Sequence, residues 1–115
     1  MHVFLVGSPL QTLGAIEAYT HYNVPINQRL IVTGSSQGLR ERPLLQLEHA
    51  LSYGEWGRTI RIQPLPYLLW IKRYTTTLLR LRNEIPHVAT LYIGSYDSEV
   101  MNNAGRLLDP ERVVL

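Results

Sequence analysis

Residues 6–22, VGSPLQTLGAIEAYTHY, place a small group of polar side chains directly after an apolar segment. Gly7 permits a sharp turn, Ser8 is suited to cap a helix, and Pro9 to occupy its first position. Gln11 follows Ser8 at the spacing of a capping box. The same helix start presents free backbone N–H groups and the positive end of the helix dipole, which favour an anionic ligand. The stretch therefore predicts either a helix start alone or a binding site built on one.

Several common kinds of site are not predicted by these residue types. The turn lacks both the G-x-G-x-x-G pattern and the P-loop lysine, and Pro9 removes one amide donor. The sequence has no cysteine, which excludes disulfides and thiolate metal ligands. No two of the four histidines stand four residues apart, so no metal site is predicted. We expect His2 and His87 to face the solvent.

Polar side chains also follow two later apolar segments. Ser35 and Ser36 come after the segment 29–34, and Tyr96 comes after the segment 89–94. The serines belong to a loop that is either a flexible polar connection or one rim of a cleft, with nearby arginines for anionic groups. Tyr96 could stack on a sugar ring, although capping of the next helix by its neighbours also explains much of that stretch.

These residues need a scaffold that brings the ends of separate segments together. Short apolar segments alternate with helical segments along the chain. Strands are expected at 2–7, 29–34, 58–63, 89–94 and 112–115, and helices at 9–22, 43–56, 66–84 and 97–108. This alternation predicts an α/β fold, a Rossmann-like open parallel sheet of about five strands with helices on both faces. Ligands of such sheets bind beyond the carboxyl ends of the strands.

The length of 115 residues suits one domain with a single core. The last expected strand has only four residues, and no helix follows it to cover the sheet. We therefore expect residues 1–115 to form one Rossmann-like domain that is the truncated N-terminal half of a longer enzyme.

Composition and charge narrow the classes of partner. Apolar residues make up 45% of the chain and charged residues 17%, which is typical of a folded domain. The formal net charge of +2 is too small to predict a nucleic-acid partner. No apolar run reaches the roughly 20 residues that span a bilayer, and the N-terminus lacks the basic start of a signal peptide. We expect a cytoplasmic protein.

The helix expected at 66–84 combines large apolar and basic side chains. Arg73 and Arg80 stand seven residues apart and share one face. The helix is either a core helix with a basic face towards solvent, or a helix that contacts an anionic membrane surface or an anionic glycan. The residues expected on its other, apolar face are Leu68, Ile71, Thr75, Leu78 and Leu79.

Two motifs, FLVGSPLQTLGAIEA at residues 4–18 and LYIGSYDSEVMNNAGRLLDPERVVL at residues 91–115, resemble a family of bacterial sialyltransferases. These glycosyltransferases build lipooligosaccharide and capsular polysialic acid. Their chains open with an apolar strand, Ser/Thr-Pro-Leu-Gln and a helix, and later have a strand with a Gly-x-Tyr turn. The matching residues here are Ser8, Pro9, Leu10, Gln11, Ala15, Ile16, Glu17, Ala18, Ile93, Gly94, Tyr96 and Asn103. The similarity is weak across residues 35–88.

The resemblance implies a GT-B-type enzyme with two Rossmann-like halves that face a cleft. This chain would be the N-terminal, acceptor-side half. The whole enzyme would transfer sialic acid from CMP-sialic acid, its donor substrate, to a surface glycan or glycolipid without a metal or other cofactor. The family's acidic-Asp-Gly turn and His-Pro motif are absent from the sequence, so no catalytic residue is expected in these 115 residues.

The resemblance also implies a set of acceptor-binding residues at the strand ends and on the first helix. Among them, Glu17 is either a solvated carboxylate or a group that positions an acceptor hydroxyl. The full set is Ser8, Pro9, Gln11, Glu17, Ser35, Ser36 and Tyr96.

Three partners besides the acceptor are expected under this interpretation. They are the missing C-terminal donor-binding domain, an anionic surface at the inner membrane, and a second copy of the chain in a homodimer. The alternative interpretation is a free-standing, non-catalytic α/β binding or interaction module.

Overall fold

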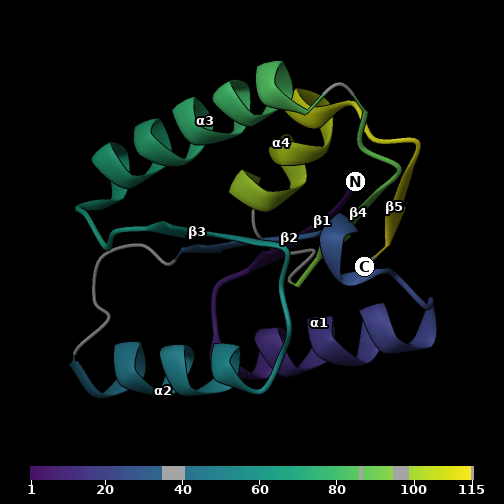
Figure 1. The fold of residues 1–115 in the computed structure, drawn as a ribbon. Helices are drawn as coiled ribbons and strands as arrows, with labels where there is room; N and C mark the ends of the chain where they lie inside the picture. Colours follow the sequence, from purple (N-terminus) through teal and green to yellow (C-terminus); the bar gives the residue numbers. More distant parts are fainter. Residues whose placement is uncertain (35–40, 86, 95–98, 115) are drawn as a thin grey trace.

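The computed structural model of this chain describes residues 1–34, 41–85, 87–94 and 99–114. A five-stranded, all-parallel sheet lies between two pairs of helices (Figure 1). The strands are β1 His2–Val6, β2 Arg29–Gly34, β3 Arg58–Ile62, β4 Thr90–Ile93 and β5 Arg112–Val114. The helices are α1 Pro9–His21, α2 Glu41–Ser52, α3 Tyr67–Glu84 and α4 Glu99–Leu108, with a short 3-10 helix at Ile26–Gln28. The predicted Rossmann-like open sheet is confirmed.

The order of the strands is β3-β2-β1-β4-β5. Helices α1 and α2 cover one face of the sheet, and α3 and α4 cover the other (Figure 1). This arrangement follows from right-handed crossovers, because the chain moves outward from β1 in one direction through β2 and β3, and in the opposite direction through β4 and β5. The strands that meet at the reversal are β1 and β4.

The central strands read as continuous apolar runs because both of their faces are buried. In β1, Val3 and Leu5 pack towards α3 and α4, whereas Phe4 and Val6 pack towards α1. The edge strand β3 is more exposed than the central strands. Two of its side chains form ion pairs with neighbouring helices, Arg58 with Glu84 at 2.7 Å and Arg61 with Glu48 at 2.6 Å.

Helix α2 begins two residues before the expected start at Pro43 and ends at Ser52 instead of residue 56. Pro43 fits inside the first turn of the helix, where a missing N–H breaks no intrahelical hydrogen bond. At the other end, the Tyr53 and Gly54 N–H groups bond to the Ala50 and Leu51 carbonyls in a tight turn that ends the helix.

The core face of α3 differs from the expected one. Its buried side chains are Trp70, Tyr74, Leu78 and Leu81. The prediction is therefore wrong for Leu68 and Leu79, which are 79% and 43% exposed. The helical period allows two apolar stripes, and the one that carries the large aromatic side chains fills the space above the sheet.

The two histidines expected in solvent have different environments. His87 is exposed and lies 3.4 Å from the Glu111 carboxylate. His2 is only partly exposed, and the prediction is wrong for it. Burial lowers the pKa of His2, and the nearby N-terminal amine and Arg112 guanidinium act in the same direction.

Candidate functional site

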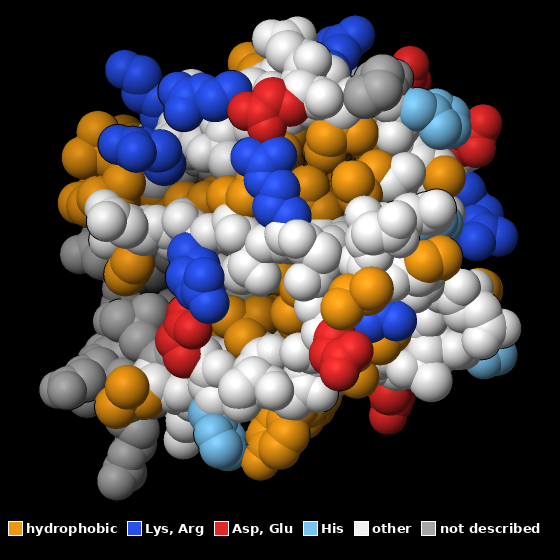
Figure 2. Space-filling view, in the orientation of Figure 1, with side chains coloured by type: hydrophobic (Ala, Val, Ile, Leu, Met, Phe, Trp, Pro, Cys, Tyr) orange, Lys and Arg blue, Asp and Glu red, His pale blue; other side chains and the backbone are white. Residues whose placement is uncertain are grey.

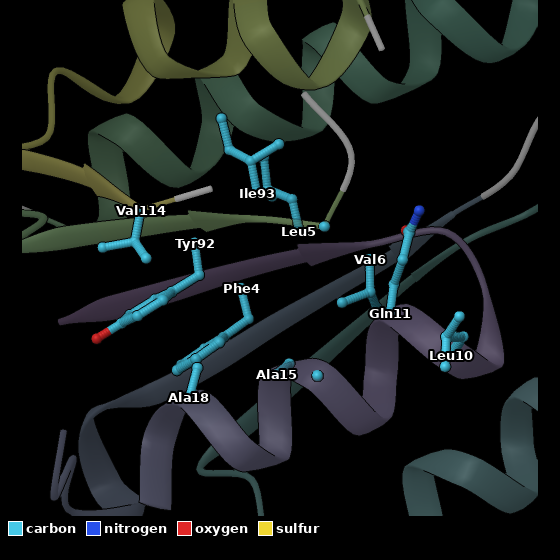
Figure 3. Close-up of a pocket in the computed structure, with 12 residues that line it drawn as sticks. Phe4, Leu5, Val6, Leu10, Gln11, Ala15, Ala18, Tyr92, Ile93 and Val114 are labelled. Atoms are coloured by element: carbon cyan, nitrogen blue, oxygen red, sulfur yellow. The ribbon is translucent and has the colours of Figure 1, made fainter. Parts of the chain in front are cut away.

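The carboxyl ends of β1 and β4 meet where the strand order reverses. Leu5 and Ile93 stand opposite each other in the register, and the Gly94 N–H donates to the Leu5 carbonyl at 3.0 Å. Ligands of open α/β sheets bind at such a switch point. A groove of about 300 Å³ opens here between α1 and the strands β1, β4 and β5 (Figure 3).

Helix α1 begins at this edge, and Ser8 holds its first turn in place. Ser8 has an extended backbone (φ −150°, ψ 161°), and its hydroxyl accepts a hydrogen bond from the Gln11 N–H at 3.2 Å. The backbone N–H and the hydroxyl of Thr12 both donate to the Ser8 carbonyl at 3.0 Å. Pro9 occupies the first helical turn. The predicted N-cap role of Ser8 and the predicted place of Pro9 in the first helical turn are confirmed.

The Gln11 side chain folds back across the end of β1. Its Oε1 accepts a hydrogen bond from the Gly7 N–H at 2.6 Å, rather than from the Ser8 N–H as a standard capping box requires. This bond occupies the carbonyl oxygen of the side-chain amide. The amide NH₂ group is then the part of Gln11 that can donate to a ligand, and it lies at the tip of the side chain (Figure 3).

Gly94 lets Gln11 approach the end of β4 closely. A Cβ atom at this position would lie 2.9 Å from Gln11 Oε1 and 3.0 Å from its Cβ and Cδ atoms, closer than real side chains tolerate. The absence of a side chain at Gly94 therefore allows Gln11 to bridge the two strand ends. Gln11 is the main polar side chain of the groove, and it lies at this junction.

The floor of the groove is an aromatic pair on the sheet. The Phe4 and Tyr92 rings stack with centroids 4.3 Å apart and planes 3° from parallel. Both side chains are buried, and burial raises the pKa of Tyr92, although the Arg112 guanidinium opposes this shift. Tyr92 thus presents a neutral phenol, and the floor adds no charge to the groove.

Small residues of α1 keep the groove open on the helix side. Gly14, Ala15 and Ala18 line it, and an added Cβ at Gly14 would meet nothing within 4 Å. Leu10 stands at one end of the groove with 79% of its surface exposed. Together with the aromatic floor, these residues make a largely apolar site with one amide group.

Only some of the predicted acceptor-binding residues lie at the groove. Gln11 lines the groove, and Ser8 and Pro9 build the helix start beside it. Glu17 is exposed on α1 and is not part of the described lining. The other three residues lie outside the described part of the chain and stay predictions: Ser35, Ser36 and Tyr96.

Sequence reasoning missed the aromatic floor. Phe4 and Tyr92 read as ordinary strand residues, and no local signal shows that β1 and β4 pair and stack these rings. In the sequence, Gly94 is the last residue of an expected strand and the first of the Gly-x-Tyr turn. Its close contact with Gln11 becomes visible only when the two strand ends are placed together.

Among the described residues, no group of three His, Asp or Glu side chains could hold a metal ion, and no helix is long and apolar enough to cross a membrane. Comparison of the chain with models of known families, with curated proteins and with solved structures finds no significant match. The resemblance to sialyltransferases therefore stays a hypothesis that rests on the two sequence motifs.

Proposed function

We propose that this chain is the N-terminal, acceptor-side domain of a metal-independent glycosyltransferase similar to the bacterial sialyltransferases, and that its groove binds a glycan acceptor. The observation that carries the proposal is the junction of Gln11 and Gly94 at the switch point of the sheet. Both residues belong to the two motifs that resemble the family. The residues that carry the resemblance thus lie where proteins with an open α/β sheet bind their ligands.

The groove suits a terminal sugar in size and chemistry. Its volume of about 300 Å³ is at the lower end of the range for small-molecule sites. That range is roughly 300–1,000 Å³. The Gln11 amide NH₂ would donate to a hydroxyl or ring oxygen of the sugar. The apolar wall formed by Leu10 and Gly14 would contact the C–H face of the ring. Donor binding and transfer from CMP-sialic acid would belong to the other half of the enzyme.

Titration of the ¹⁵N-labelled chain with oligosaccharides that end in galactose or in sialic acid tests the binding. We expect shifts of the backbone signals of Gln11, Gly14 and Gly94, and loss of these shifts in Gln11→Ala. The matched control is Gln63→Ala, an exposed glutamine that is not part of the described groove lining. Unchanged signals around the groove with every sugar tested would contradict the proposal.

The enzymatic part of the proposal is tested separately by CMP release from CMP-sialic acid. The assay needs the protein encoded by the whole parent gene together with a glycan acceptor. Acceptor-dependent CMP release that falls in Gln11→Ala without a change in donor KM would support an acceptor-side role. Absence of CMP release with all acceptors would contradict the transferase function.

A second candidate function is the non-catalytic interaction module, which the apolar lining of the groove favours. Leu10 projects beside the groove, so in a symmetric dimer Leu10 of one copy could enter the groove of the other. Sedimentation equilibrium over a range of concentrations distinguishes this function. A dimer that Leu10→Ser dissociates, together with absence of glycan binding, would favour the interaction module.

A further inference from the structure

The outer face of α3 brings exposed apolar and basic side chains together. At the start of the helix, Leu68 and Leu69 are 79% and 55% exposed. The basic side chains follow within the next three turns and are also exposed. We call this surface the α3 patch; it consists of Leu68, Leu69, Lys72, Arg73 and Arg80. Figure 2 shows the Lys and Arg side chains gathered over α3, beside hydrophobic side chains near the start of the helix.

The cations of the α3 patch have no ion-pair partner within the part of the chain that the structure describes. The acidic residue of α3 is Glu84, which stands at the last position of the helix and pairs with Arg58. Glu48, on the opposite layer, pairs with Arg61. The positive charge of the patch is therefore not neutralised by these carboxylates and is available to an anionic partner.

Two threonines that line a hollow between the basic residues of the patch have their hydroxyl groups satisfied. Thr76 and Thr77 donate to the carbonyl oxygens of Lys72 and Arg73 at 2.8 and 2.7 Å. A hydroxyl that donates to its own helix loses less when it is moved out of water, because the hydrogen bond persists. These residues thus lower the desolvation cost of placing this face against an apolar or interfacial phase.

The hollow has a volume of about 560 Å³ and runs along the patch. Leu65 and Leu69 line it together with Lys72, Arg73 and Arg80. Apolar contact and anion binding are therefore offered side by side on one surface. The hollow is large enough to take a lipid headgroup between the cations and beside the two leucines.

We propose that the α3 patch binds the surface of an anionic lipid bilayer. A soluble polyanion would pair the cations and leave Leu68 and Leu69 in water, and a neutral apolar partner would cover the leucines and leave the cations unpaired. The interface of an anionic bilayer satisfies both groups, as it does for other basic amphipathic helices that lie in the plane of a membrane.

The patch begins at the edge of the sheet where the groove opens. Helix α3 follows β3 and α1 follows β1, so both helices start at the carboxyl ends of parallel strands (Figure 1). The groove nevertheless lies on the α1 face of the sheet, opposite to α3, so a domain docked through the α3 patch would hold the groove on the side that faces away from the lipid (Figure 1). Binding of the bilayer does not rest on the proposed function of the groove.

Co-sedimentation with vesicles tests the proposal. The two preparations are pure phosphatidylcholine and an equal mixture of phosphatidylcholine and phosphatidylglycerol. We expect binding to the mixed vesicles that weakens with added salt, and much weaker binding to the neutral ones. Each basic side chain at an anionic surface contributes about fivefold to the partition coefficient, so Arg73→Gln with Arg80→Gln should lower it about 25-fold. The matched control, Arg82→Gln with Arg106→Gln, should change it by about twofold or less.

The apolar part of the patch is tested by a second pair of variants. Leu68→Ser with Leu69→Ser should lower binding to the mixed vesicles by about tenfold, since two leucines no longer enter the interface. Both side chains are exposed, so the fold does not depend on them. The matched control is Leu13→Ser with Leu45→Ser, which removes two exposed leucines from the opposite helix layer and should leave binding unchanged.

Three results would overturn the proposal. The first is absence of binding to the mixed vesicles, and the second is an equal loss in the two arginine pairs, which would indicate attraction by net charge alone. The third is competition by soluble heparin together with normal vesicle binding of the leucine variant, which would identify a polyanion site. Gln11→Ala separates the two proposals, because it should abolish glycan binding and leave vesicle binding unchanged.

Discussion

The contact between Gly94 and Gln11 allows a quantitative test of the groove. In Gly94→Ala, the new Cβ would lie 2.9 Å from Gln11 Oε1 and 3.0 Å from its Cδ. Gln11 must then rotate away and give up the 2.6 Å hydrogen bond from the Gly7 N–H. Loss of one such bond costs about 0.5–1.5 kcal/mol, and leaving the Gly7 N–H without its partner adds up to about 1 kcal/mol.

A smaller effect acts in the opposite direction. Replacing glycine by alanine stabilises the folded state by about 0.4–1 kcal/mol, because the unfolded chain loses conformational freedom. The backbone φ of Gly94 is not in the left-handed region, so this gain applies here. We therefore expect Gly94→Ala to lower the free energy of unfolding by about 1 kcal/mol in total, measured by urea denaturation.

A double-mutant cycle identifies the cause of the loss. In a Gln11→Ala background, the Oε1 and Cδ atoms that meet the new methyl group are absent, so Gly94→Ala should cost about 0.5–1 kcal/mol less than it does in the wild type. Additive effects of the two substitutions would refute the reasoning, because they would show that the two residues do not interact. A stabilising effect of Gly94→Ala in the wild type would refute it as well.

Three further predictions concern stability. Gly14→Ala should raise the free energy of unfolding by about 0.5–1 kcal/mol in urea denaturation, because an added Cβ meets nothing within 4 Å and alanine favours the helix interior; a loss of stability would contradict the open groove. The folded state lowers the pKa of His2 below its ordinary value of 6.5, so the unfolded state binds the proton more tightly and stability should fall as the pH drops below 6.5. Urea midpoints compared above and below that pH should show a smaller fall in His2→Gln than in the wild type, and equal falls would exclude His2 as the source. Tyr74 is fully buried, burial raises its pKa, and its hydroxyl has no hydrogen-bond partner among the described residues. Tyr74→Phe should therefore leave the free energy of unfolding, measured by thermal denaturation, unchanged or raise it. A fall of more than about 1 kcal/mol would reveal a hydrogen-bond partner for the hydroxyl.

Local sequence patterns predicted most elements of the fold because their causes are local. The strands β1 and β2 each contain an apolar run, and the start of α1 follows from a capping serine and a proline at residues 8 and 9. Alternation of polar and apolar residues at 58–62 is typical of a strand that is less buried, as β3 is. These features depend on residues that are neighbours in the chain, so one sequence is enough to identify them.

The choice between two apolar stripes on α3 needed the tertiary structure. Leu68 and Leu79 satisfy the helical period as well as the buried stripe that contains Trp70, Tyr74 and Leu78. Periodicity alone gives no preference, because both stripes are apolar. The sheet selects the stripe with the larger side chains, and this selection leaves exposed the leucines of the α3 patch.

The sequence by itself determined the class of fold, the helix start at Ser8 and the choice of Gln11 as a candidate binding residue. Only the tertiary structure decided the strand order and the surroundings of Gln11. The pairing of β1 with β4 joins segments from the two ends of the chain, stacks Phe4 on Tyr92, and brings Gly94 against Gln11. Such contacts depend on which distant strands pair, and pairing is decided by the packing of the whole sheet against its helices rather than by any local run of residues.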